Sequence, residues 1–242
     1  MTFWEQKLAQ IKWLLVADDI KNFMEWAPLQ QTMIVGNAGY IANMIDETIF
    51  NYKVDNLLKE PDFITKKYFY PGTTWLPNSI VQLFHLNYLE YVQDKIIIAN
   101  GCGVNHLDSI FEFGGGIGSM CRLIKQLGFK GKYIIYDFPE IIEIQKFYLG
   151  ECNLLENVEF YSNMGDLFFD YSNVDLFIAH QSLSETDKET RAIFIHNMNA
   201  KHYFVSFAKQ WENMDNLEYF KKNGFHVESM PYVGNNVYYG VK

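Results

Sequence analysis

The fold is decided by the stretch Ile110–Gly118, which reads IFEFGGGIG. Its first residues are those of a buried strand, and the glycines that follow form a turn that opens a helix from Ser119 to Leu127. Glycine is needed where the backbone approaches a ligand closely or takes a positive φ. The stretch therefore predicts a strand, a ligand-binding turn and a helix in direct succession.

The glycine spacing indicates which ligand the turn binds. The pattern is E-x-G-x-G-x-G, whereas the dinucleotide fingerprint is G-x-G-x-x-G and would place its third glycine at position 119, which is Ser119. We therefore expect S-adenosylmethionine rather than NAD, and a turn with a purely structural role is the alternative. The residues expected to bind this cofactor are Glu112, Gly114, Gly115, Gly116 and Gly118.

A second acidic residue closes the next predicted strand. Asp137 follows Tyr133–Tyr136 and lies nineteen positions beyond Gly118, close to the spacing of about 20 expected for a carboxylate that grips a ribose diol. The same residue could be the N-cap of a helix that opens at Pro139, and the two roles are compatible. We assign Asp137 to the ribose and count the adjacent Phe138 among the cofactor-binding residues.

The chain around this stretch reads as a parallel sheet, because short apolar runs alternate with helical stretches after Gly103. The last two runs are too close together for a crossover helix and should pair antiparallel across a turn at 231–235. The predicted strands are Ser109–Phe113, Lys132–Tyr136, Val158–Tyr161, Val174–Ala179, His202–Phe207, His226–Met230 and Asn236–Val241.

The N-terminal part reads as helical. Apolar residues recur at helical spacing in Phe3–Trp26, with a break near Asp18, and again in Asn37–Leu58 and Ser79–Gln93. The connection between the last two helices contains a turn at Pro71-Gly72.

Two motifs after the second strand carry a family resemblance. Asp137–Glu140 reads DFPE and Gln145–Leu149 reads QKFYL; both resemble the D-L-P-E and Q-x-Y-Y-L patterns of the sugar O-methyltransferase family, with conservative departures at Phe138 and Phe147. Asp175–Ile178 and Ser182–Glu185 are similar to the family's D-L-(I/F) strand and S-F-S-E segment. The resemblance covers about residues 108–190.

This resemblance implies a class I methyltransferase fold of the α/β class. The expected architecture is a helical N-terminal cap, residues 1–105, and an S-adenosylmethionine-binding domain, residues 106–242. The domain would hold a Rossmann-like sheet of seven strands, mostly parallel, with a C-terminal antiparallel hairpin. In this fold Glu112 would face the cationic amino-acid end of the cofactor, and Asp166 would bind the adenine amino group. A surface turn residue is the alternative for Asp166.

His180 ends the fourth predicted strand, at the edge of the sheet where open α/β folds bind ligands. An imidazole with a pKa of about 6.5 can take the proton of an acceptor hydroxyl as the methyl group moves. We therefore name His180 as the candidate base and Glu185 as the residue that orients it. The alternatives are that His180 is a wall of the cofactor pocket and that Glu185 positions the acceptor. His85 and His106 are weaker candidates and fit structural roles better.

The composition of the chain limits the classes of molecule that it is expected to bind. A net charge of −9 and a pI of about 5.1 argue against nucleic acids and anionic membranes, which favours a small-molecule acceptor. The family resemblance implies that this acceptor is a sugar or another small hydroxylated compound. No motif indicates a metal, and Cys102, Cys121 and Cys152 fit a reduced cytoplasmic protein. The apolar faces of the first two helices could pair subunits as a homodimer. A non-sugar acceptor, a non-catalytic interaction subunit and an NAD-dependent reductase remain as alternative functions.

Overall fold

The computed structural model describes residues 3–36, 39–51, 57–96, 103–171, 173–231 and 236–242. The chain divides into two compact units, which are described separately below. The chain passes from unit 2 to unit 1 inside the glycine turn, at Gly116, and again directly after Asp137. Unit 1 contains residues 1–99, 116–128 and 138–156, and unit 2 contains residues 100–115, 129–137 and 157–242.

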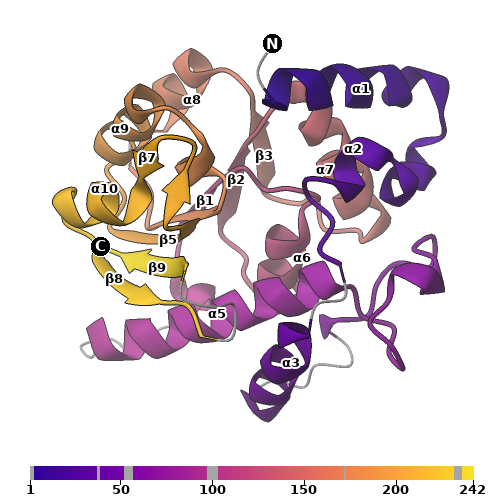
Figure 1. The fold of residues 1–242 in the computed structure, drawn as a ribbon, viewed down its shortest axis with the longest axis horizontal. Coiled ribbons are helices and arrows are strands. Elements are labelled where there is room, and N and C mark those ends of the chain that lie inside the picture. The colour runs from indigo at the N-terminus through magenta and orange to yellow at the C-terminus, as the bar shows by residue number, and fades with distance from the viewer. Residues whose placement is uncertain (1–2, 37–38, 52–56, 97–102, 172, 232–235) are drawn as a thin grey trace. The chain divides into compact units, whose positions relative to one another are not determined.

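Unit 1 is helical, as the N-terminal sequence predicted (Figure 1). The predicted break at Asp18 is confirmed, because its carboxylate accepts a hydrogen bond from Trp26 Nε1 at 2.8 Å while Asp19 caps the next helix. The helices of this unit are α1 (Phe3–Ala17), η1 (Ile20–Glu25), α2 (Ala27–Gln30), α3 (Tyr40–Asn51), η2 (Lys66–Tyr68), α5 (Pro77–Ile96), α6 (Ser119–Gln126) and α7 (Pro139–Glu151).

The predicted turn at Pro71-Gly72 is confirmed. Gly72 has a φ of +79°, and Thr73 N donates to Tyr70 O at 3.0 Å. The predicted helix 37–58 is observed as α3, and residues 52–56 lie outside the described residues. Within the described part of the chain no helix is long and apolar enough to cross a membrane.

Unit 2 contains a seven-stranded sheet in the order β3-β2-β1-β4-β5-β9-β8. Neighbouring strands are parallel except that β9 runs antiparallel to both β5 and β8. This confirms the predicted class I methyltransferase sheet with its C-terminal hairpin. The strands are β1 (Ser109–Phe113), β2 (Lys132–Tyr136), β3 (Val158–Tyr161), β4 (Leu176–His180), β5 (His202–Ala208), β8 (His226–Ser229) and β9 (Val237–Val241).

Besides shifts of one residue at an end of β4, β5, β8 and β9, two features of unit 2 differ from the prediction. Strand β4 starts at Leu176 rather than Val174, because the Asp175 carboxylate accepts hydrogen bonds from the backbone N–H groups of Asp108 and Ser109 ahead of the ladder. A separate two-stranded sheet, β6 (Gln210–Trp211) and β7 (Met214–Asp215), was not predicted. The predicted 231–235 turn lies almost wholly outside the described residues.

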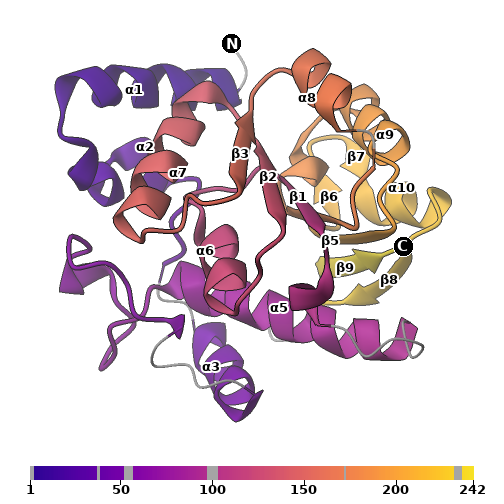
Figure 2. The same ribbon diagram turned by 180° about the vertical axis from the view of Figure 1, so that it is seen from behind.

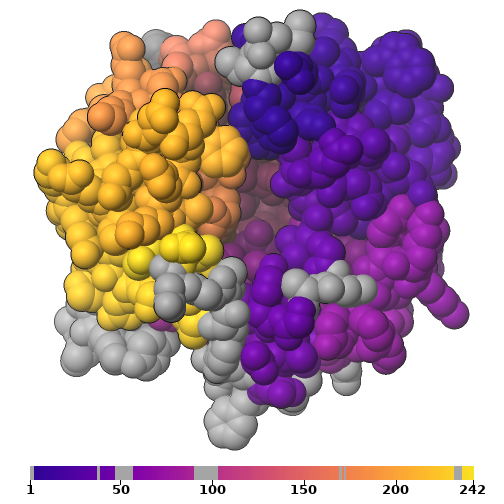
Figure 3. Space-filling model, viewed as in Figure 1, coloured from indigo at the N-terminus to yellow at the C-terminus, as the bar shows by residue number. Residues whose placement is uncertain are grey.

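One face of the sheet packs on α8 (Met164–Asp170), α9 (Lys188–Asn197) and α10 (Asn216–Lys222) (Figure 2). Phe111 and Phe113 of β1 belong to this core, and both contact Phe194 of α9. Side chains alternate between the faces of a strand, so Glu112 lies on the opposite face. In Figure 3 the visible surface of unit 2 is formed largely by its C-terminal segments, coloured orange to yellow.

Candidate functional site

The carboxyl ends of β1, β2 and β4 meet at one edge of the sheet in unit 2, because these strands are parallel and adjacent. Glu112 is the penultimate residue of β1, Asp137 directly follows β2, and His180 is the last residue of β4. The structure therefore brings three of the residues selected from the sequence to the edge where open α/β sheets bind their ligands.

Glu112 is a buried carboxylate with little compensation for its charge. The residue is 4% exposed, and the Tyr133 hydroxyl donates a hydrogen bond to Oε2 at 2.8 Å. Burial raises the pKa of Glu112 from 4.5 to about 7; the Tyr133 hydrogen bond lowers it and the charge of Asp137 raises it. Among the described residues no cation forms an ion pair with Glu112. Such a carboxylate is stabilised by a cationic ligand.

The first glycine of the turn serves the packing of the protein. Gly114 has a φ of +71°, and a Cβ placed on it would lie 2.4 Å from Cβ of Ser182. Ser182 follows β4 and donates its hydroxyl hydrogen to the carbonyl of Phe113. Gly114 is therefore required by the close approach of the segment after β4, and Gly115 beside it is buried.

Gly116 presents the opposite situation, because a Cβ placed on it would meet nothing within 4 Å. The backbone there has a φ of +56°, and its carbonyl accepts a hydrogen bond from Nε2 of the fully buried Gln145 at 3.0 Å. The turn is thus held from α7 while space remains beside Gly116. This is the arrangement that a close ligand contact requires.

Gly118, the last glycine of the turn, begins α6 as its N-cap with a φ of +93°. A Cβ there would lie 3.4 Å from side-chain atoms of both Tyr148 and Leu149. Gln145, Tyr148 and Leu149 all belong to the motif that carries the family resemblance. Their observed contacts show that this motif supports the glycine turn, a role that the sequence analysis did not assign.

Asp137 is 9% exposed, and its backbone N–H donates to the carbonyl of Tyr161 at 3.0 Å. The N-cap of α7 is the next residue, Phe138, and no side chain caps the helix there. The N-cap role considered for Asp137 is therefore wrong. Phe138 itself is 44% exposed, although phenylalanine is among the residues most often buried.

Asp166 lies in the first turn of α8 and is exposed. The Asn163 side chain caps this helix by accepting hydrogen bonds from the N–H groups of Gly165 and Asp166, at 2.7 and 3.4 Å. Asp166 is therefore a helix residue and not the surface turn residue considered as an alternative. A carboxylate in the first turn also interacts favourably with the helix dipole.

His180 has a partner that the sequence did not reveal. Its Nδ1 lies 3.2 Å from Oγ of Ser206 on β5, which is 2% exposed. Glu185 lies in the short helix η4 (Leu183–Glu185), where its N–H donates to the carbonyl of Ser182. Gln181 stands between His180 and this helix with a φ of +63°, and its Oε1 accepts a hydrogen bond from Ala208 N at 3.1 Å. A left-handed glutamine beside these residues is the kind of backbone strain that clusters at functional sites.

The other histidine and metal candidates contribute little to this edge. Burial lowers the pKa of His85 in α5 to about 3, so its imidazole is neutral, and His106 is exposed on η3 (Val104–His106). The described residues include no group of three or more metal-ligating side chains. The expected independence from metals stays a prediction.

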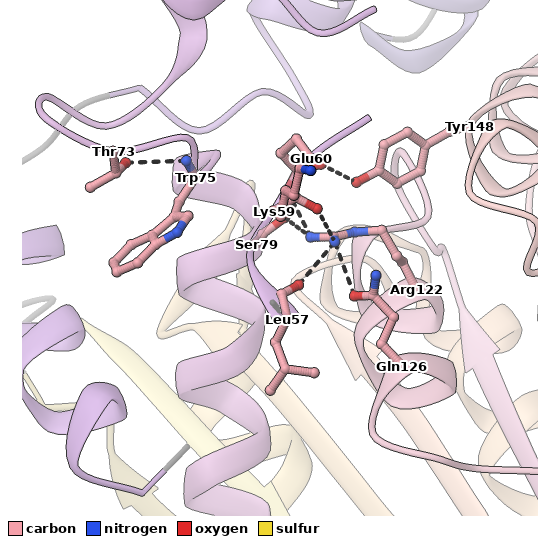
Figure 4. Close-up of polar contacts among 9 residues, drawn as sticks. All are labelled: Leu57, Lys59, Glu60, Thr73, Trp75, Ser79, Arg122, Gln126 and Tyr148. Atoms are coloured by element: carbon pink, nitrogen blue, oxygen red, sulfur yellow. Dashed lines mark hydrogen bonds and ion pairs between the residues drawn. The ribbon is translucent and has the colours of Figure 1, made fainter. Parts of the chain in front are cut away.

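Unit 1 contains a buried polar network around Arg122 and Glu60 (Figure 4). Arg122 of α6 donates from Nη2 to Glu60 Oε1 at 2.7 Å and to Ser79 Oγ at 2.8 Å, and the Tyr148 hydroxyl donates to Glu60 Oε2 at 2.6 Å. The side chains of Arg122 and Glu60 are both 0% exposed. Arg122 Nη1 also reaches the carbonyls of Leu57 and Lys59 and Oε1 of Gln126.

Comparison with protein families now decides the class of enzyme. Residues 86–202 match the model of the O-methyltransferase domain, which is just under half of the chain. The chain is an S-adenosylmethionine-dependent methyltransferase. No curated protein matches this methyltransferase in sequence.

Several solved structures resemble the methyltransferase. The 16S rRNA methylase ArmA is 16% identical with a TM-score of 0.46, over 85% of this chain and 98% of that one. An O-methyltransferase family protein from Burkholderia thailandensis is 11% identical with a TM-score of 0.43, over 84% and 71%. A SAM-dependent methyltransferase from Aquifex aeolicus is 12% identical with a TM-score of 0.44, over 64% and 96%. Neither an acceptor nor a residue role follows from likenesses at this level.

Proposed function

We propose that this methyltransferase moves the methyl group of S-adenosylmethionine to a hydroxyl oxygen of a small acceptor, and that the acceptor is a sugar. The match of residues 86–202 to the O-methyltransferase domain supports transfer to oxygen. The motifs at Asp137–Glu140, Gln145–Leu149 and Ser182–Glu185 support the sugar. The buried carboxylate of Glu112, which lacks a cationic partner among the described residues, is the observation that carries the proposal.

The residues at the sheet edge fit this cofactor. Glu112 would attract its cationic amino-acid end, and the space beside Gly116 would admit the ligand against the backbone. Asp137 would accept hydrogen bonds from the ribose hydroxyls, with Phe138 and Asp166 near the adenine. When bound, the cofactor supplies an electrophilic methyl group. The protein then contributes mainly by orienting the acceptor oxygen and excluding water.

His180 is our candidate for the proton acceptor. A neutral imidazole that donates from Nδ1 to Ser206 Oγ carries its lone pair on Nε2, and this atom would take the acceptor's hydroxyl proton. Positioned base catalysis of this kind contributes roughly 10² to 10⁴-fold. Glu185 would orient the imidazole or the acceptor from η4.

The remaining assignments follow from sequence and charge. We propose that residues 1–105 form an acceptor-binding or dimerisation region and residues 106–242 the catalytic domain, in a cytoplasmic protein. The net charge of −9 supports a small-molecule acceptor over a nucleic acid.

Calorimetric titration with S-adenosylmethionine tests the cofactor site. We expect micromolar binding by the wild-type protein, no binding of NAD, and a loss of affinity of about 10-fold or more in Asp137→Asn, because the amide has one acceptor oxygen and no charge, where the carboxylate has two acceptor oxygens and a negative charge. If the wild-type protein does not bind S-adenosylmethionine, the alternative of a non-catalytic interaction subunit gains support.

Methyl transfer to a panel of sugars, with hydroxylated non-sugar compounds alongside, tests the acceptor. His180→Ala should lower kcat by about 10² to 10⁴-fold while the Kd for the cofactor stays unchanged. Equal turnover in this variant would remove His180 from the base role. Activity confined to non-sugar compounds would overturn the sugar assignment and leave the methyltransferase chemistry intact.

A further inference from the structure

Two aromatic rings of unit 1, those of Trp4 and Phe138, contact each other, and Phe138 follows Asp137 directly in the chain. The Trp4 ring of α1 lies 6.2 Å from the ring of Phe138, centroid to centroid, at an interplanar angle of 35°. Phe3 contacts Trp4 edge to face at 5.7 Å. Figures 1 and 2 both place the N-terminal part of α1 beside α7, which Phe138 caps. The N-terminal helix thus reaches the chain position directly after the proposed ribose residue.

These rings are not packed as core residues are. Phe138 is 44% exposed and Phe3 is 48% exposed, whereas Phe23, which packs against Phe147 and Tyr148 in the same unit, is 0% exposed. Exposed aromatic surface that gathers at one place marks a binding site more often than isolated exposed residues do. The cluster formed by Phe3, Trp4 and Phe138 therefore offers apolar ring surface to a ligand.

The chemistry of the neighbouring site indicates which ligand part would use this surface. The cofactor's adenine is attached to the ribose that Asp137 is proposed to hold, so the base must lie within a few ångströms of this carboxylate. Purine rings stack on aromatic side chains, with a contribution of about 1–3 kcal/mol per base. Phe138 is adjacent to Asp137 in the chain, and Trp4 contacts Phe138.

We propose that Trp4 is a further cofactor-binding residue, which forms with Phe138 a stacking surface for the adenine of S-adenosylmethionine. This inference rests on the proposed function, since it needs the cofactor to be held at Asp137. It gives α1 a direct part in cofactor binding, in addition to any part in the N-terminal region's own packing.

The test compares Trp4→Leu with Trp13→Leu. Trp13 lies on the same helix and is 67% exposed, so its replacement is a matched control. Each variant is titrated with S-adenosylmethionine and with 5′-methylthioadenosine, which retains the adenosine but lacks the amino-acid end. We expect Trp4→Leu to weaken both ligands by about 10-fold and Trp13→Leu to weaken neither. Glu112→Gln should weaken only S-adenosylmethionine.

These outcomes separate the two proposals. Wild-type affinity for both ligands in Trp4→Leu would overturn the role of Trp4 while leaving the proposed function in place. Absence of binding by the wild-type protein would instead overturn the proposed function.

Fluorescence supplies a second measurement if Trp4→Leu loses its helical circular dichroism. We expect 5′-methylthioadenosine to quench the tryptophan emission of the wild-type protein and to quench that of Trp4→Phe much less, because stacking acts on the Trp4 indole. Equal quenching in the two proteins would overturn the proposal.

Discussion

Glu60 in unit 1 and Glu112 in unit 2 are both buried glutamates, at 5% and 4% exposure, yet their surroundings differ. Glu60 accepts hydrogen bonds from Arg122, Ser79 and Tyr148, one of them within an ion pair of 2.7 Å. Glu112 accepts one from Tyr133, and burial raises its pKa to about 7. A buried charge with a complete set of partners supports the fold, whereas one without a cation is suited to receive a ligand.

The largest effect on stability should come from removing Arg122, the cationic partner of Glu60. Arg122→Met leaves the Glu60 carboxylate buried without its cation, and we expect the free energy of unfolding to fall by about 3–5 kcal/mol. Chemical denaturation measures this change. The double variant Glu60→Leu with Arg122→Met removes both charges and should recover part of the loss. A loss below about 1 kcal/mol in the single variant would show that Glu60 is not compensated by Arg122.

Replacing Glu112, which has no cationic partner among the described residues, should change the stability in the opposite direction. The folded-state pKa of Glu112 is raised, so its ionisation opposes folding increasingly as the pH rises from 4.5 to about 7, and the full cost persists above that. Glu112→Gln should therefore stabilise the protein by roughly 3 kcal/mol at pH 8, at about 1.4 kcal/mol per pH unit, and by little at pH 4.5. Thermal unfolding at both pH values measures the difference. Destabilisation at pH 8 would mean that a partner compensates the charge.

Gly114 and Gly116, two of the glycines in the turn, extend this comparison between packing and ligand binding. Gly114→Ala forces a Cβ against Ser182 and should destabilise the protein by about 1–3 kcal/mol. Gly116→Ala has open space and should lose only about 1 kcal/mol for its positive φ, but it should weaken S-adenosylmethionine binding because the methyl group takes up ligand space. Chemical denaturation of both variants measures the change in stability, and titration with S-adenosylmethionine measures the change in affinity. Unchanged cofactor affinity in Gly116→Ala would place the ligand elsewhere.

The sequence predicted the elements of the sheet well because each depends on local periodicity. The bounds of β1, β2 and β3 agree with the prediction, and the hairpin follows from the short spacing of the last two runs. Strands β6 and β7 have two residues each and leave no periodic signal.

The partners at the site could not be predicted, because they are distant in the chain and join side chains of common types. Tyr133 is 21 residues from Glu112, Ser206 is 26 residues from His180, and Arg122 is 62 residues from Glu60. The hydrogen bond from Gln145 to the carbonyl of Gly116 has a partial indication in the sequence, since Gln145 belongs to the QKFYL motif that carries the family resemblance.

The central claim is that Glu112 is the cation-binding carboxylate of the cofactor site, and the pH dependence of cofactor binding tests it most directly. Calorimetry between pH 5.5 and 7 keeps the ligand's amino group protonated, and the same titration of Glu112→Gln separates the charge of Glu112 from that of the histidines, which also titrate in this range. With a pKa of about 7, the association constant of the wild-type protein should rise roughly 10-fold over this range, and that of Glu112→Gln should be low and constant. An equal slope in both proteins would contradict the account.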